Sequence, residues 1–372
     1  MSTPSGSPTC GRRVQSPRLL RCARVVASAI LAACGTLEPE SFAPTWTSLG
    51  LDGRTVLALA ETPWGLYAGT GGAGVFRYDQ TAAMWEPAGL TDQGPINDLL
   101  YLSTEPPRLL AAVGPRPGAV VDAVVFASDD GETWVPSDGG YASITGEGAA
   151  GYSLARTRSG QPELFVAAPG LVMRSTDAAH SWRAVFGDTT VENDVPRISI
   201  DQNGIVWVAA NWVTACCVFH SADGGLTWDG RTPSGSLRYG GSWWSDVSVT
   251  EDGRLWMVAA AILRPDDPRL PEGTNTVAVS RDSGATYDLA RMSHRGALLA
   301  IHLRFFSAAD TLYTIAQQAG NALGVYRLRP GHTTLDEISA SPGVAGGLSA
   351  TLDAGGRLLV GTAGTGVWRM EW

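Results

Sequence analysis

Short apolar runs separated by turn residues recur along this chain and predict an all-β fold. Residues 56–60 are apolar, and two further strand-like runs follow at 66–70 and 74–77. No segment shows the periodicity of an amphipathic helix, and the 45 glycines and 22 prolines agree with a chain of strands and turns. Turns rich in Asp, Asn and Gly, which favour antiparallel hairpins, precede later apolar runs. They lie at residues 201–204, 251–253 and 353–356.

An eight-residue pattern, Ser-x-Asp-x-Gly-x-Thr-Trp, recurs along the chain. A short Asp side chain can accept hydrogen bonds from backbone N–H groups two residues on, and Gly supplies the positive φ that such a turn needs. A repeat of this kind with a period of roughly 40–50 residues is typical of a β-propeller. The copies are SADGGLTW at 221–228, ASDDGETW at 127–134, STDAAHSW at 175–182 and SRDSGATY at 280–287, with the aspartates Asp223, Asp129, Asp177 and Asp282.

The pattern resembles the Asp-box, or BNR, repeat of sialidases, sortilin-type receptors, two-propeller xyloglucanases and a photosystem II assembly factor. The resemblance implies a propeller in which each repeat joins the third and fourth strands of a blade, at the rim and away from the axis. It also implies that the four aspartates are structural and not catalytic.

The two ends of the chain predict a closed ring. Residues 359–362 and 366–369 echo the runs that follow residue 66, and the chain then stops before a fourth strand. The isolated strand predicted at 45–50 can supply that strand, which removes the exposed sheet edges.

Aromatic markers give the number of blades. They stand at Trp85, Trp134, Trp182, Trp228 and Tyr287. One divergent blade without the repeat, from about residue 295 to 342, and the terminal blade complete the ring. We therefore predict a single β-propeller over residues 45–372 with seven four-stranded blades of about 47 residues; six or eight blades stay open.

The first 33 residues are predicted to be a lipoprotein signal peptide. They carry five arginines and no acidic residue, and they end in an apolar run at 25–33. This run is too short to span a membrane, which takes about 20 residues. Residues 31–34 (LAAC) resemble the bacterial lipobox, which implies that Cys34 carries the lipid and that 34–44 is a linker. Gly35 follows in place of Asp, which favours the outer membrane or the cell surface. An ordinary signal peptide, with Cys34 incidental, is the alternative.

Charge and composition exclude several partners. The whole chain has a formal charge of −9, and without the signal peptide it is more acidic still, so a nucleic-acid partner is not expected. Every basic residue is Arg, which excludes lysine-based catalysis. Neither a cofactor nor a metal is predicted, since the histidines are scattered. Cys216 and Cys217 are adjacent on a predicted strand and point to opposite faces, so two free thiols or one strained disulfide stay open.

One loop is a candidate ligand site. In propellers, ligands usually lie at the mouth of the central channel, and residues 231–246 are predicted to lie there. Aromatic side chains beside Arg and Asp suit the recognition of a sugar or a peptide. The alternative is that this segment begins a strand and a tryptophan packs between blades. The candidate residues are Arg238, Tyr239, Trp243, Trp244 and Asp246.

The motifs expected of enzymes with this repeat are missing. The Phe/Tyr-Arg-Ile-Pro motif of sialidases does not occur, and one propeller cannot form the cleft between two propellers that xyloglucanases use. We therefore predict a monomeric, non-catalytic lipoprotein of the cell envelope that binds a carbohydrate or a protein. A divergent sialidase-like glycoside hydrolase and an envelope assembly factor are the alternatives.

Overall fold

The computed structural model describes most of the chain after residue 43, and residues 44–372 form one compact unit. The predicted signal peptide, Cys34 and all of the linker except Pro44 lie outside the described residues. The described ranges are 44–115, 122–139, 141, 150–158, 162–187, 194–212, 215–231, 244–259, 274–292, 298–308, 311–318, 323–329, 332, 334–341 and 346–371.

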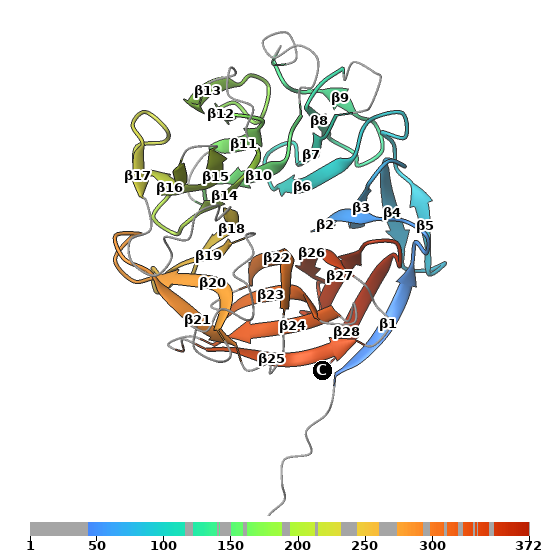
Figure 1. Cartoon of the computed structure of the whole chain (residues 1–372). Coiled ribbons are helices and arrows are strands. Elements are labelled where there is room, and N and C mark those ends of the chain that lie inside the picture. The colour runs from blue at the N-terminus through green and yellow to red at the C-terminus, as the bar shows by residue number, and fades with distance from the viewer. Residues whose placement is uncertain are drawn as a thin grey trace, which may run out of the picture. The chain divides into compact units, whose positions relative to one another are not determined.

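Seven four-stranded antiparallel blades surround a central channel, which confirms the predicted fold and blade number (Figure 1). The blades consist of β2–β5, β6–β9, β10–β13, β14–β17, β18–β21, β22–β25 and β26–β28 with β1. The strands are β1 (Thr45–Gly50), β2 (Val56–Thr62), β3 (Gly65–Thr70), β4 (Val75–Asp79), β5 (Met84–Pro87), β6 (Ile96–Leu102), β7 (Arg108–Val113), β8 (Val125–Ser128), β9 (Val135–Pro136), β10 (Ser153–Arg156), β11 (Leu164–Ala168), β12 (Leu171–Ser175), β13 (Arg183–Gly187), β14 (Asp194–Ile200), β15 (Val206–Trp212), β16 (Ala215–Ser221), β17 (Asp229–Arg231), β18 (Trp244–Val249), β19 (Leu255–Ala259), β20 (Thr274–Ser280), β21 (Asp288–Met292), β22 (Leu298–Ala308), β23 (Thr311–Gln318), β24 (Leu323–Leu328), β25 (Thr334–Ser341), β26 (Gly347–Leu352), β27 (Leu358–Thr362) and β28 (Val367–Glu371).

The ring closes through β1, as the sequence predicts. β1 pairs antiparallel with β28, from Thr45 opposite Glu371 to Gly50 opposite Val367, so the seventh blade contains strands from both ends of the unit (Figure 1). Elsewhere in the ring, the outermost strands of blades five and six also pair, through Arg291 opposite Thr334 in parallel orientation. Both pairings cover strand edges that would otherwise be open to other chains.

The hydrophobic core is divided into seven clusters, one between each pair of neighbouring blades. The second strands of the blades, such as β11 and β27, are buried along their whole length. A strand that is buried on both faces needs apolar residues at consecutive positions, and this explains the continuous runs in the sequence. Each blade therefore depends on both neighbours for its stability.

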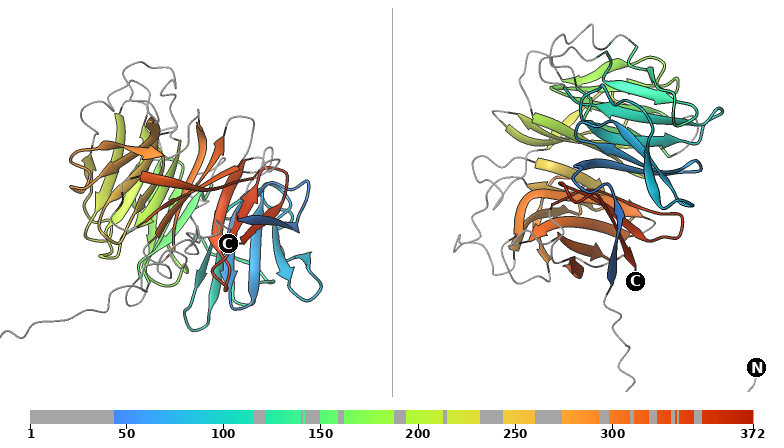
Figure 2. Two further views of the ribbon diagram at one scale, coloured as in Figure 1. Left: turned by 90° about the horizontal axis from the view of Figure 1, so that it is seen from below. Right: turned by 90° about the vertical axis from the view of Figure 1, so that its right-hand side faces the viewer.

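The two faces of the propeller differ in what they carry. Each blade is a meander, so all seven innermost strands begin at one face, here called the mouth face. They end at the opposite face, which also carries the turns between third and fourth strands and is here called the turn face. β1 begins at the turn face, because Thr45 pairs with the last residue of β28. Figure 2 shows the blades from two sides.

Among the described residues, none of the helices has the length and apolar character that crossing a membrane requires.

Candidate ligand site in the central channel

The repeat turns are held together by their own side chains. In the turn of residues 221–228, Asp223 Oδ1 accepts hydrogen bonds from the N–H of Thr227 (2.9 Å) and from Ser221 Oγ (2.7 Å). Asp223 Oδ2 accepts a third from Thr227 Oγ1 (2.6 Å). Because both carboxylate oxygens are engaged within the turn, this aspartate is a poor candidate for binding a ligand.

Asp177 and Asp282 form the same turn in other blades. Asp282 accepts from the hydroxyl and the N–H of Thr286 (2.6 and 2.8 Å), and Asp177 accepts from the corresponding groups of Ser181 (2.5 and 2.9 Å). Hydrogen bonds to a carboxylate favour its ionised form. Those from the Thr286 hydroxyl, then from its N–H, lower the pKa of Asp282 to about 2.

The remaining turn corrects the sequence assignment, because Asp130 and not Asp129 occupies the Asp position. Asp130 Oδ1 accepts from the N–H of Thr133 (2.7 Å) and from Ser128 Oγ (2.9 Å). Asp129 instead pairs with Arg108, at 2.8 Å between Nε and Oδ1. This copy is one residue shorter, since Ser128 supplies the hydroxyl that the alignment placed at the preceding residue.

The marker tryptophans link each blade to the preceding one. Each indole N–H donates to a backbone carbonyl in or just after the outermost strand of the neighbouring blade. The pairs are Trp85 to Leu49 (2.9 Å), Trp134 to Ala88 (2.6 Å), Trp182 to Ser137 (2.7 Å) and Trp228 to Val185 (2.8 Å).

Trp46 has the same role in the seventh blade and was missed in the sequence. Its indole N–H donates to Ser339 Oγ of blade six (2.9 Å). The signal was present, because Thr45 and Trp46 reproduce the last two residues of the repeat. The N-terminal strand therefore supplies the end of the repeat turn as well as the missing strand.

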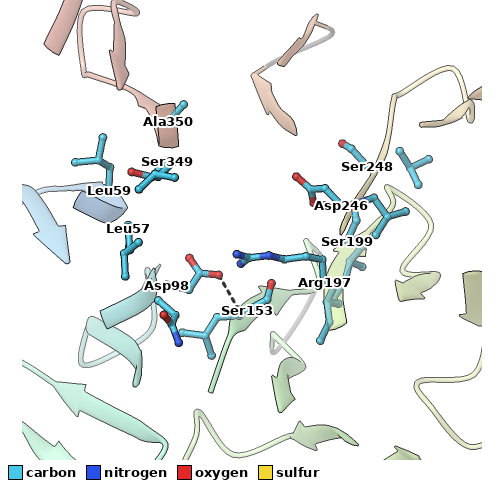
Figure 3. A pocket seen from close by; sticks show the side chains of 18 of the residues that line it. Leu57, Leu59, Asp98, Ser153, Arg197, Ser199, Asp246, Ser248, Ser349 and Ala350 are labelled. Carbon is cyan, nitrogen blue, oxygen red and sulfur yellow. Dashed lines mark hydrogen bonds between the residues drawn. The ribbon is translucent and has the colours of Figure 1, made fainter. Parts of the chain in front are cut away.

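A cavity of about 280 Å³ occupies the central channel, away from the repeat turns (Figure 3). Each innermost strand contributes one residue at the same height along the channel. These residues correspond to one another because each pairs with the equivalent residue of the second strand in its own blade. We call this set the channel ring. Its members lining the cavity are Ala58, Asp98, Ser153, Arg197, Asp246 and Ser349, and the backbone of Arg304 holds the equivalent position of β22.

Irregular pairing places these side chains in the channel. In six blades the pairing register shifts directly before the ring residue, as between Ile96 and Asp98 or between Trp244 and Asp246. An extra residue in one strand re-aims the side chains that follow it. The ring residues therefore face the axis although the flanking strands obey the ordinary alternation.

Backbone N–H groups hold the two ring carboxylates. Asp98 accepts from the N–H of Leu99 on Oδ1 (2.9 Å) and from the N–H of Leu154, in the next blade, on Oδ2 (2.8 Å). Asp246, which is only 7% exposed, accepts from the N–H of Val247 (2.9 Å). Both carboxylates are fixed acceptors on the channel wall.

Arg197 is the ring cation whose side chain the structure describes. Its Nη1 donates to the carbonyl oxygen of Tyr152 (2.9 Å), which orients the half-buried guanidinium. In Figure 3 the side chain extends into the cavity towards Asp98, with Asp246 on its other side. The guanidinium forms no ion pair with a carboxylate of the described residues, so its remaining N–H donors are available to a ligand.

Apolar residues line the cavity in most blades, among them Leu57 and Leu348 of blades one and seven and Leu154, Ile198 and Val247 of blades three to five. The charged ring residues Asp98, Arg197 and Asp246 come from blades two, four and five (Figure 3). At the turn-face end, Arg158 also lines the cavity and pairs with Glu251 of blade five (3.6 Å).

The structure describes the predicted ligand-site residues only in part. Arg238, Tyr239 and Trp243 lie outside the described residues, and for Trp244 the structure describes the backbone, which begins β18. Asp246 lines the channel. In the part of the chain that the structure describes, no group of three or more His, Cys, Asp or Glu side chains could hold a metal ion.

No protein-family model and no curated protein matches the chain. Solved structures do resemble it. A streptogramin B lyase has a TM-score of 0.60 at 9% identity, over 88% of this chain and 97% of that chain. YCF48 bound to D1 peptide has 0.56 at 13%, over 88% and 96%. The GH74 xyloglucanase from Xanthomonas campestris has 0.57 at 15%, over 88% and 53%. These likenesses show the β-propeller fold, which hydrolases and binding proteins share.

Proposed function

We propose that this chain is a non-catalytic binding protein of the bacterial cell envelope, anchored through Cys34, whose propeller binds a carbohydrate or a protein partner at the mouth face. The observation that carries the proposal is the channel ring, because it gathers charged and polar side chains from several blades in one cavity. The repeat turns fit the Asp-box pattern, and their aspartates accept hydrogen bonds from groups within the same turn. They are therefore poor candidates for binding a ligand.

The position of β1 supports an anchored binding protein. β1 begins at the turn face, so a tether that precedes Thr45 joins the propeller there. The mouth face, which carries the open end of the channel ring in this proposal, lies at the other end of the blades. YCF48 was solved with a bound peptide on the same fold, which is consistent with a protein ligand.

A divergent glycoside hydrolase is the second candidate, because the ring places the carboxylates Asp98 and Asp246 in one cavity. Glycosidases use two carboxyl groups, one of which donates a proton. Both oxygens of Asp98 accept backbone N–H groups, an arrangement that suits a fixed acceptor better than a proton donor.

The two candidates are separated by measuring binding and turnover on the same protein. A glycan array and a pull-down from envelope extract report binding, and fluorogenic sialosides and glucosides report hydrolysis. We expect binding without turnover, weakened by substitutions at the mouth face and unchanged by Asp223→Asn in a repeat turn. Turnover that disappears in Asp246→Asn would instead establish the hydrolase.

A further inference from the structure

The described wall of the channel offers open hydrogen-bond donors in one sector, around Arg197. We propose that the channel ring binds a carboxylate group of its ligand and that Arg197 holds this group. An acidic sugar and a peptide are two sources of the same carboxylate, and the experiment below distinguishes them. This inference rests on the proposed binding function and specifies the chemical group that the channel recognises.

Most of the donors of Arg197 are open. A guanidinium carries five N–H donors, and in the part of the chain that the structure describes the one hydrogen bond of this side chain runs from Nη1 to the carbonyl oxygen of Tyr152 (2.9 Å). That bond orients the planar group and leaves its other donors unused. Because a guanidinium presents pairs of parallel N–H groups that match the two oxygens of a carboxylate, an oriented and unpaired guanidinium is suited to hold one.

Two hydroxyl groups near Arg197 are open as well. Ser199 follows it by two residues on β14, and Ser153 begins β10 of the preceding blade; both residues line the cavity. Pairing is regular from Arg197 to Ser199, so both side chains lie on the same face of the strand. Among the described residues, neither hydroxyl has a hydrogen-bond partner. Each hydroxyl can therefore donate to an oxygen of a bound carboxylate.

The carboxylates of the ring are already engaged, and they limit the charge of the ligand. Asp98 and Asp246 accept backbone N–H groups and have further interactions, so the open capacity of this sector lies in its donors. The two aspartates lie on either side of the Arg197 side chain (Figure 3). The guanidinium offsets their repulsion of one negative charge on a ligand, but a second charge would be repelled without a second free cation among the described ring residues. A singly charged carboxylate therefore fits better than a doubly charged phosphate ester.

Isothermal titration of the purified full-length protein with two matched pairs of probes tests the proposal. D-Glucuronate differs from D-glucose by its carboxylate, and acetyl-trialanine differs in the same way from its C-terminal amide. We expect at least one carboxylate probe to bind saturably, and roughly tenfold to a hundredfold more tightly than its neutral partner, as expected for a charge-assisted hydrogen bond. The pair that responds identifies the source of the carboxylate. This comparison needs no variant, so it holds even if substitutions disturb folding.

The matched variants are Arg197→Gln and Arg281→Gln, which change the net charge equally. Arg281 lies in a repeat turn at the turn face, where its exposed side chain pairs with Asp288 (2.8 Å). We expect Arg197→Gln to weaken carboxylate binding by roughly tenfold or more and Arg281→Gln to leave it within about twofold. Arg197→Lys, which keeps the charge and loses the planar fork, should lie between the wild type and Arg197→Gln. Equal carboxylate affinity in the wild type and Arg197→Gln would overturn the proposal.

Two further results would also overturn it. One is the absence of saturable binding by both carboxylate probes at about 10 mM, a concentration that reveals even millimolar sites. The other is tighter binding of D-glucose 6-phosphate than of either carboxylate probe. Glycan or protein binding at the mouth face would survive these results, so the two proposals fail separately.

Discussion

Replacing Ala178 by Gly should stabilise the propeller, because this residue has a left-handed backbone in its repeat turn. The φ of Ala178 is 58°, and the equivalent residue of the next turn, Gly224, has a φ of 71°. An L-residue in this region costs roughly 1–2 kcal/mol, which glycine avoids. Glycine also gains freedom in the unfolded chain, which offsets roughly 0.4–1 kcal/mol. The expected net gain in the free energy of unfolding is about 0.5–1 kcal/mol.

Two neighbouring substitutions serve as controls. Ala179 also has a positive φ, of 73°, but its methyl group is fully buried between blades two and three. Losing a buried methyl costs about 0.8 kcal/mol, so Ala179→Gly should be close to neutral. In Gly224→Ala the new Cβ would lie 3.1 Å from both the Arg174 guanidinium carbon and Glu163 Oε2, in addition to the strained φ, so this change should destabilise by more than about 1 kcal/mol.

Urea denaturation followed by tryptophan fluorescence measures all three variants against the parent chain. The reasoning predicts the order Ala178→Gly, Ala179→Gly, Gly224→Ala from most to least stable. A lower midpoint for Ala178→Gly, or an unchanged midpoint for Gly224→Ala, would refute the account of these turns.

Other predictions test closure, pH dependence and anchoring. Deleting residues 45–50 should abolish the cooperative thermal transition, because blade seven loses its outer strand; an unchanged melt would contradict ring closure. Trp182→Phe should lower the free energy of unfolding in urea by about 1 kcal/mol, since it loses one hydrogen bond to blade two. The pKa of Asp282 is lowered from 3.8 to about 2, so its stabilising contribution should be present above pH 4 and be lost as the pH falls towards 2. Urea midpoints at pH 5 and pH 2 measure this loss, which should shrink in Asp282→Asn. Cys34→Ser should move the protein from the membrane to the soluble fraction, and a membrane-bound variant would contradict lipidation.

The repeat and the apolar runs were sufficient to predict the fold. The turn around Asp223 is built from residues adjacent in sequence, so its hydrogen bonds can be anticipated from the residue types alone. The strands at the end of the chain repeat the strand pattern of blade one but lack a fourth strand. This similarity between blades predicted that β1 pairs with β28. Asp129 shows the limit of this approach. Its turn is one residue shorter than the others but contains the same residue types, so the sequence did not show that Asp130 occupies the Asp position.

The channel ring was decided by the tertiary structure. Asp98 and Arg197 stand in different blades, about two repeats apart in the chain, and neither belongs to the repeated pattern. Ring closure brings their strands around one axis, and a shift of pairing register turns both side chains towards it. When the register shifts by one residue, the side chains of a strand move to the opposite face. The sequence of a single strand does not determine its register with the neighbouring strand. Local turn chemistry is therefore readable in the sequence, whereas the convergence of charges in the channel depends on how the blades pair and close.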